Sequence, residues 1–137
     1  MQLLELASLI VDFGLVVLTW IVQLVIYPSF RYYAVKDLKS WHLKYTRRIT
    51  IVVFPLMISQ LILHSYFAFE NPAILAITTA LLVVLNWLIT FFFAVPLHGK
   101  IDTGQDPAYP IKQLIYLNWL RTGFWSLIMI LTWIMIL

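Results

Sequence analysis

Four long apolar stretches constrain what this chain can fold into. They cover residues 4–28, 49–69, 73–97 and 114–136, and each reaches the roughly 20 residues with which an α-helix crosses about 30 Å of hydrocarbon. Hydrophobic residues make up 63% of the 137 residues and charged residues only 11%, more apolar surface than a soluble domain could cover with polar groups. The sequence predicts an all-α integral membrane four-helix bundle, a single transmembrane domain over residues 1–137.

The basic residues indicate how this bundle is oriented. Every lysine and arginine except Arg121 lies in one of two joints, 29–48 and 98–113, whereas the Glu70-Asn71-Pro72 turn and both termini carry none. The positive-inside rule then predicts two basic cytoplasmic loops, with the N- and C-termini both outside. The net charge of +3 reports this topology, and we expect the lipid bilayer and no nucleic acid as a partner. We expect the chain in the cytoplasmic (inner) membrane of a bacterium.

Several kinds of site are excluded by composition. The chain has no cysteine, which rules out disulfides, thiolate metal sites and thiol redox catalysis. It also lacks a glycine-rich phosphate loop. His98, Asp102 and Asp106 are metal-ligand types without a metal-site spacing, so we predict no metal site. The sequence does not identify a cofactor, and haem and quinone are both candidates.

The fourth stretch contains Asn118-Trp119-Leu120-Arg121-Thr122, followed by Trp125. At 3.6 residues per turn, Asn118, Arg121, Thr122 and Trp125 share one helix face. An arginine in such a segment costs several kcal/mol unless it finds a partner, which predicts a functional residue. We expect Asp102 or Asp106 to fold back from the preceding loop and pair with Arg121.

Polar residues on the other three stretches predict one polar seam through the bundle, because orphaned polar groups are costly in hydrocarbon. The cytoplasmic half of this seam is predicted to bind a ligand through Gln23, Tyr27, Asn86, Trp87, Thr90, Asn118, Thr122 and Trp125, with Trp20 and Trp119 flanking it. The outer half is predicted to hold Asp12, Gln60 and His64. A purely structural hydrogen-bond network is the alternative for both halves.

Two prolines and one amphipathic segment complete the expected layout. Tyr27-Pro28 and Pro96 are expected to end the first and third helices, since proline disfavours helix in the residue before it. Leu38, Trp41 and Tyr45 form an apolar stripe with basic residues on the other side. This stripe predicts either an interfacial helix against anionic headgroups or a cytoplasmic extension of the second helix. His42, in the same segment, is a candidate site residue.

The chain combines four spans with Tyr27-Pro28, with His42 in a joint and with Asn118-Trp119-Leu120-Arg121-Thr122 in the last span. In this combination it resembles the small anthrone oxygenase-like membrane proteins. The resemblance covers most of the chain in architecture. It implies cofactor-independent oxidation of polycyclic phenolic substrates. It also implies that Arg121, Asn118 and His42 bind or deprotonate a flat phenolic or quinone-like ligand stacked on tryptophans.

Two functional hypotheses follow. In the first, the protein binds, oxidises or isomerises a small lipid-soluble aromatic or isoprenoid molecule in a polar cavity open to the cytoplasmic leaflet. Arg121 then stabilises an oxyanion, and His42 or His98 acts as a base. In the second, the bundle is a proton, ion or solute conduit, or an accessory subunit of a larger membrane complex. A narrow four-helix bundle would conduct as a homo-oligomer, and Asp12 and His64 favour this alternative.

Overall fold

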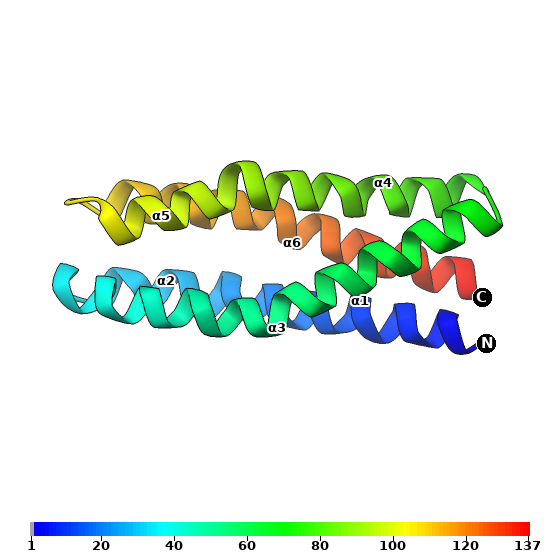
Figure 1. The fold of residues 1–137 in the computed structure, drawn as a ribbon, viewed down its shortest axis with the longest axis horizontal. Coiled ribbons are helices and arrows are strands. Elements are labelled where there is room, and N and C mark those ends of the chain that lie inside the picture. Colours follow the sequence, from blue (N-terminus) through cyan, green and yellow to red (C-terminus); the bar gives the residue numbers. More distant parts are fainter. Residues whose placement is uncertain (1) are drawn as a thin grey trace.

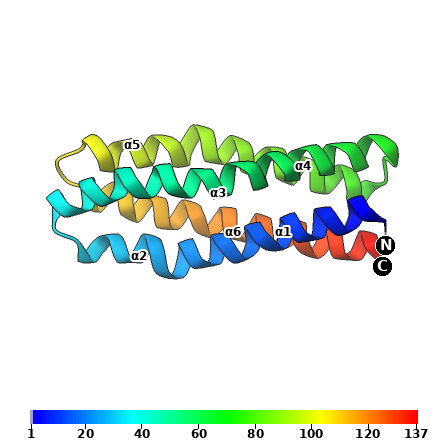
Figure 2. The same cartoon turned by 60° about the horizontal axis from the view of Figure 1, so that its bottom comes forward.

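The computed structural model describes residues 2–137, which form four antiparallel helical rods (Figures 1 and 2). The first rod consists of α1 (Leu3–Ile21), the π-helix η1 (Val22–Ile26), α2 (Tyr27–Ser29) and the 3₁₀ turn η2 (Phe30–Tyr32). The second rod is α3 (Val35–Glu70). The third consists of α4 (Ile74–Ile89), the π-helix η3 (Thr90–Ala94) and α5 (Val95–Thr103), and the fourth is α6 (Ala108–Ile136).

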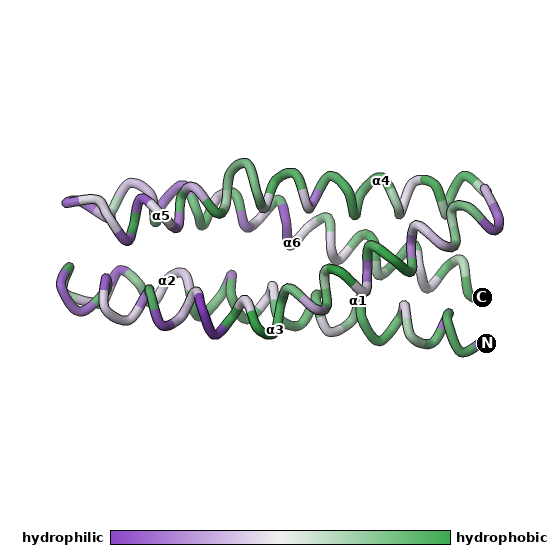
Figure 3. The backbone as a smooth tube through the Cα atoms, viewed as in Figure 1, coloured by the Kyte–Doolittle hydropathy of each residue, from purple (hydrophilic) through white to green (hydrophobic). Residues whose placement is uncertain are grey.

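The rods pack as a square in which α1 contacts α3 and α6, and α4 contacts the same two helices. No strand occurs within residues 2–137, so the predicted all-α four-helix fold is confirmed. The two termini lie at the same end of the bundle as the turn between α3 and α4, and we call this the terminal end (Figure 1). The opposite end holds the other two turns, and Figure 3 shows that hydrophilic residues gather there; we call it the basic end.

The outer surface of the bundle is apolar over most of its length. In the most hydrophobic window of each rod, only 17% to 33% of the residues are buried inside the bundle, so most apolar side chains point outward. Water would oppose such a surface, whereas a bilayer accepts it, and helices satisfy their own backbone hydrogen bonds in lipid. All four rods are long and apolar enough to cross a membrane, as an integral membrane protein requires.

The connections between the helices are shorter than the predicted loops 29–48 and 98–113. The rods continue as helix through most of both segments, and the connecting turns are only residues 33–34 and 104–107. The length of an apolar stretch indicates how much of a helix lies in hydrocarbon, but it does not show where the helix ends. The polar residues of 35–48 lie outside the apolar stretch and are still helical. α3 alone is 36 residues long, which corresponds to about 54 Å. Of the two alternatives for the amphipathic segment, the extension of the second helix is correct.

The turn into α6 depends on Gly104. The backbone N–H of Gly104 donates to the carbonyl oxygen of Lys100 at 2.9 Å. A Cβ atom at this position would lie 2.5 Å from that oxygen, closer than side chains tolerate. Asp106 then accepts a hydrogen bond from the backbone N–H of Ala108 at 3.0 Å at the start of α6. The turn is therefore compact, and these polar atoms form hydrogen bonds within the turn itself.

Pro28 and Pro96 do not end their helices, contrary to expectation. Each lies in the first turn of an α segment that directly follows a π-helix, η1 before Pro28 and η3 before Pro96. A proline lacks an N–H and its ring clashes with the carbonyl four residues earlier in regular α geometry. The wider π turn relieves this conflict, so the first and third rods continue past their prolines.

Two apolar clusters form the core and lie on either side of a polar layer. The cluster nearer the basic end includes Phe30, Leu38 and Ile101, and the cluster nearer the middle includes Leu15, Val83 and Ile128. Leu38 and Tyr45 of the predicted headgroup-facing stripe are buried in the first cluster, which corrects that expectation; Trp41 is 36% exposed. Leu38 and Tyr45 therefore face the bundle, whereas Trp41, Lys44 and Arg48 face outward.

Replacing Ile128 by alanine should destabilise the bundle by about 2 kcal/mol, because a fully buried side chain leaves a cavity that its neighbours fill only in part. Ile130→Ala, on the same helix at 51% exposure, is the matched control and should change stability by less than about 0.5 kcal/mol. Unfolding of both variants in one detergent measures the difference. Equal losses would contradict this assignment of the core.

Candidate functional site

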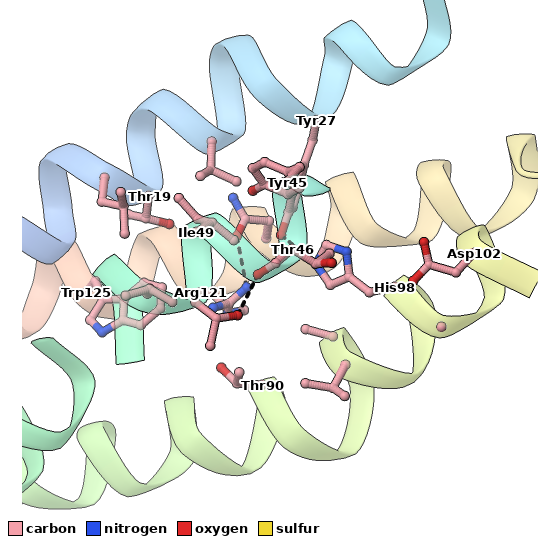
Figure 4. A pocket seen from close by; sticks show the side chains of 18 residues that line it. Thr19, Tyr27, Tyr45, Thr46, Ile49, Thr90, His98, Asp102, Arg121 and Trp125 are labelled. Carbon is pink, nitrogen blue, oxygen red and sulfur yellow. Dashed lines mark hydrogen bonds between the residues drawn. The ribbon is translucent and has the colours of Figure 1, made fainter. Parts of the chain in front are cut away.

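A cavity of about 380 Å³ lies inside the bundle between the two core clusters, and all four rods line it. We call it the inner cavity. Its main polar lining residues are Thr19, Tyr27, Tyr45, His98, Asp102 and Arg121. Figure 4 shows Tyr27 and Tyr45 approaching Arg121 from one side and Thr90 from the other. The volume lies at the small end of the range for ligand pockets and suits a molecule of two or three fused rings.

Arg121 is the central charge of this cavity and is only 7% exposed. Its Nη1 donates to Asn118 Oδ1 at 3.3 Å, and its guanidinium carbon lies 4.8 Å from the ring centroid of Trp125. Both Tyr27 and Tyr45 lie within electrostatic range of the guanidinium. Within residues 2–137, the Nε of Arg121 has no hydrogen-bond partner. The cation is thus held in place while part of its donor capacity stays unused.

The predicted ion pair between Arg121 and a loop aspartate is not formed. Asp102 belongs to α5 rather than to a flexible loop, and its Oδ1 lies 2.6 Å from Nδ1 of His42. Asp106 accepts from the backbone at the start of α6. The expectation failed because helix α5 fixes the direction of Asp102 toward α3. In the part of the chain that the structure describes, no carboxylate lies within salt-bridge distance of Arg121.

Four side chains form a hydrogen-bonded relay from the inner cavity toward the basic end. The hydroxyl of Tyr27 lies 3.1 Å from Nε2 of His98, and Nδ1 of His98 lies 2.8 Å from Nε2 of His42. The Asp102 carboxylate accepts from Nδ1 of His42. In the arrangement with both imidazoles neutral, Nε2 of His42 accepts from Nδ1 of His98, and Nε2 of His98 accepts from the Tyr27 hydroxyl, so all three bonds run toward Asp102.

This relay can carry a proton away from the inner cavity. His42 is fully buried, whereas the Asp102 side chain is 19% exposed. A proton released at Tyr27 can pass through His98 and His42 to Asp102 and reach solvent, since each bond then runs toward the carboxylate. His42 does not line the cavity and orients His98, whereas Tyr27, His98 and Asp102 line it.

Three of the predicted ligand-binding residues form a clamp beside the cavity. Asn118 Nδ2 donates to Gln23 Oε1 at 2.8 Å, and Thr122 shares a hydrogen bond with Thr19 at 2.9 Å. Gln23 and Thr122 do not line the inner cavity, whereas Asn118 does. The clamp fixes α1 and η1 against α6 and presents Asn118 Oδ1 to Arg121.

The structure places the predicted ligand contacts of the third rod in different surroundings. Thr90 lines the inner cavity, but Asn86 and Trp87 do not. Trp87 stacks on Phe91, with centroids 5.3 Å apart, and packs partly buried against the middle core cluster. Asn86 is fully buried, and within the described residues its side-chain amide has no hydrogen-bond partner. Residue spacing placed these side chains on the seam, but it could not show which of them face the cavity.

Of the four tryptophans expected to flank the seam, Trp125 alone lines the inner cavity. Trp20 and Trp119 pack edge to face with centroids 5.7 Å apart, and both are largely exposed at 38% and 46%. They belong to the outer, lipid-facing surface of the bundle.

The structure brings Asp12, Gln60 and His64 together as predicted by their depth, and adds Thr132; we call these four residues the outer polar cluster. Asp12 Oδ1 accepts from Gln60 Nε2 at 2.7 Å, and Oδ2 accepts from Thr132 at 2.7 Å. Nε2 of His64 lies 3.2 and 3.1 Å from the two oxygens. All four side chains are at most 1% exposed.

Trp125 connects this cluster to the inner cavity. Its Nε1 donates to Gln60 Oε1 at 3.0 Å, while its ring lies against the guanidinium of Arg121. Because an indole only donates, this bond fixes the orientation of the Gln60 amide, and hence its donation to Asp12.

Sequence reasoning missed two functional side chains, Tyr45 and Thr132. Tyr45 lies one turn after His42 on the same helix face, a spacing that links the two, but the basic neighbours suggested a membrane-surface stripe instead. Thr132 shares a face with Trp125, two turns away on α6. A single threonine in an apolar run gives no signal by itself, since it can bond its own helix backbone.

Within residues 2–137, no group of three or more His, Asp or Glu side chains is arranged to hold a metal ion. The chain matches no protein-family model, no curated protein and no solved structure.

Replacing Trp125 by phenylalanine keeps a ring beside Arg121 but leaves Gln60 Oε1 buried without its donor. The expected loss of stability is about 1–3 kcal/mol. Trp119→Phe is the matched control, because Trp119 is 46% exposed, and should change stability little. Thermal unfolding of both variants in one detergent is the measurement, and an unchanged midpoint for Trp125→Phe would contradict the bridge.

Proposed function

We propose that this protein binds a flat, lipid-soluble phenol or quinone-like molecule in the inner cavity and moves a proton at its oxygen. The observation that carries the proposal is a buried guanidinium without a carboxylate partner among residues 2–137, which lines the same cavity as three members of the Tyr27–His98–His42–Asp102 relay. A cation without a carboxylate partner is suited to an oxygen that gains negative charge.

The chemistry assigns one role to each group. Arg121 stabilises the phenolate or enolate oxygen, and Trp125 and Tyr45 provide aromatic surface for a flat ring. Tyr27 accepts the ligand proton as its own passes to Nε2 of His98, and Nδ1 of His98 passes its proton to Nε2 of His42. The Asp102 carboxylate stabilises the imidazolium that forms transiently at His42, as in other carboxylate–histidine pairs. Removal of a proton from such an oxygen is shared by isomerisation and by cofactor-independent oxidation, which is the activity implied by the family resemblance.

The surface around the inner cavity supports a ligand that arrives from the bilayer. Thr50 on α3 and Val95 and Gly99 on α5 line the cavity and are also exposed on the side of the bundle. An opening between two rods, rather than at the end of the bundle, suits an aromatic or isoprenoid molecule dissolved in lipid.

The conduit hypothesis is supported by one observation, the presence of buried titratable groups in the outer polar cluster as well as in the relay. The connection between them runs through the Trp125 indole and the Gln60 amide. Neither group gives up and regains a proton near neutral pH, in contrast to histidine or a carboxyl group. We therefore favour the ligand-binding function.

For the orientation we propose that the basic end faces the cytoplasm. Eight of the nine Lys and Arg residues lie in segments 29–48 and 98–113, near the two turns of that end, and the ninth is the buried Arg121. The positive-inside rule then places both termini outside and opens the relay, through Asp102, to the cytoplasm.

Arg121→Leu should weaken binding of 2-hydroxy-1,4-naphthoquinone, a flat acid that is ionised at neutral pH, by roughly 10- to 100-fold, the loss expected for a charged hydrogen bond. Arg121→Lys should recover part of this affinity because it retains the charge. Arg48→Leu, at an exposed arginine on α3, is the control and should bind normally. Titration of the purified proteins in detergent measures this, and full affinity of a folded Arg121→Leu would reject the proposed site.

The absence of native cysteines permits a direct test of orientation. Asp37→Cys at the basic end and Asn71→Cys at the terminal end are both at exposed positions. In intact bacteria expressing either variant, a membrane-impermeant maleimide should label Asn71→Cys and not Asp37→Cys. In inverted vesicles the pattern should reverse, and the opposite result in both preparations would invert the topology.

A further inference from the structure

The outer polar cluster contains the buried countercharge of Arg121. Within residues 2–137, Arg121 is the buried member of the Lys and Arg residues, and Asp12 is the buried member of the Asp and Glu residues. Three donors, from Gln60, His64 and Thr132, converge on the Asp12 carboxyl, an arrangement that an ionised carboxylate satisfies. With little water between them, opposite charges stabilise each other over longer distances than at a surface.

Asp12 and Arg121 are connected by a short chain of contacts. Asp12 accepts from Gln60, Gln60 accepts from Trp125, and the Trp125 ring lies against the guanidinium. Because this path contains an indole and an amide, it transmits charge polarisation while blocking the passage of protons. The chain of contacts therefore joins Asp12 to Arg121 without providing a route for a proton between them.

The geometry points to a second site: we propose that Asp12 takes up a proton when an anionic ligand occupies the inner cavity. This inference rests on the proposed function. An anion at Arg121 neutralises the guanidinium, and the buried Asp12 carboxylate then lacks its countercharge. By linkage, the ligand raises the proton affinity of Asp12 and the proton raises the ligand affinity by the same factor.

Thr132 supplies the acceptor that a protonated Asp12 needs. Its Oγ1 lies 2.7 Å from Asp12 Oδ2 and 2.9 Å from the carbonyl oxygen of Ile128. When Oδ2 carries a proton, the hydroxyl of Thr132 donates to Ile128 and accepts from Asp12. Every polar atom then remains satisfied. Protonation of His64 instead would place an N–H on Nδ1, a buried atom with no partner within residues 2–137, so the proton resides on Asp12.

The terminal end is the side from which the proposed proton would enter, because the inner cavity lies beyond Trp125 on the other side of the outer polar cluster. A hollow of about 510 Å³ opens there between α1, α3, α4 and α6, lined by Glu5, Ser8, Tyr66 and Glu70. Ser8 lies one turn before Asp12 on the same face of α1. The binding of an anion at one level of the bundle is thus paired with proton uptake from the opposite end.

Other titratable groups face the two charges and have to be distinguished from Asp12. Around Arg121 these are Tyr27 from α2, Tyr45 from α3 and His98 from α5, with His42 and Asp102 behind them. Around Asp12 the titratable neighbour is His64 of α3, and Glu5 and Glu70 line the hollow above it. A proton taken up by the relay would depend on His98, whereas a proton taken up by the outer polar cluster depends on Asp12 and Thr132.

Calorimetric titration of the full chain with 2-hydroxy-1,4-naphthoquinone, in buffers of different ionisation enthalpy, counts the protons taken up on binding. The wild-type protein should take up a fraction of a proton, at most one, and its affinity should fall by up to tenfold per pH unit as the pH rises through the interval of uptake. Asp12→Asn and Thr132→Val should each reduce the uptake and flatten the pH dependence, while His98→Gln should retain the uptake.

Uptake that persists in a folded Asp12→Asn variant, or that disappears in His98→Gln instead, would overturn the inference while leaving the proposed function intact. Failure of the wild-type protein to bind the probe would reject the proposed function and the inference together. Infrared difference spectra of the wild-type protein provide a measurement independent of variant folding. Probe binding should produce the carbonyl stretch of a protonated carboxyl group, and its absence would also overturn the inference.

Discussion

One positive charge inside an apolar bundle governs the arrangement of this molecule. Arg121 cannot snorkel to either end, because it is buried between the two core clusters, and an uncompensated guanidinium in hydrocarbon costs several kcal/mol. Asn118 and the Trp125 ring each reduce that cost. The clamp of Gln23, Asn118 and Thr122, with Thr19 as the partner of Thr122, holds the helix that carries Arg121 in register.

The two polar networks differ in whether they border open volume. In the outer polar cluster the carboxyl group of Asp12 has a donor on each oxygen, Gln60 is bonded at both ends of its amide, and all four side chains are enclosed by the bundle. Arg121, His98 and Tyr27 instead line the inner cavity. An enclosed network serves packing, whereas a network that lines a cavity has capacity for a ligand.

The helical spans and the composition of the polar layers follow from sequence, because apolar length and helical spacing directly encode them. Asp12, Gln60 and His64 were grouped correctly because depth in the bilayer is set by residue count along a helix. Partners were harder to predict. The turn residues around Asp102 predict a loop from which its side chain could reach Arg121. In the structure α5 continues through Asp102, and its carboxylate bonds to His42 instead. Asn86 and Trp87 share the spacing of true lining residues, and only packing of α4 against its neighbours decides that they do not reach the cavity.

The two π-helical segments give the inner cavity an adjustable size. η1 and η3 sit on different rods at the level of the cavity, and each contributes lining residues, Val22 from η1 and Thr90 and Ala94 from η3. A π turn followed by a proline is a point at which a helix can bend without losing further hydrogen bonds. Bending at these two points would change the distance between the basic-end portions of the first and third rods, and with it the range of ring systems that the proposed site could hold.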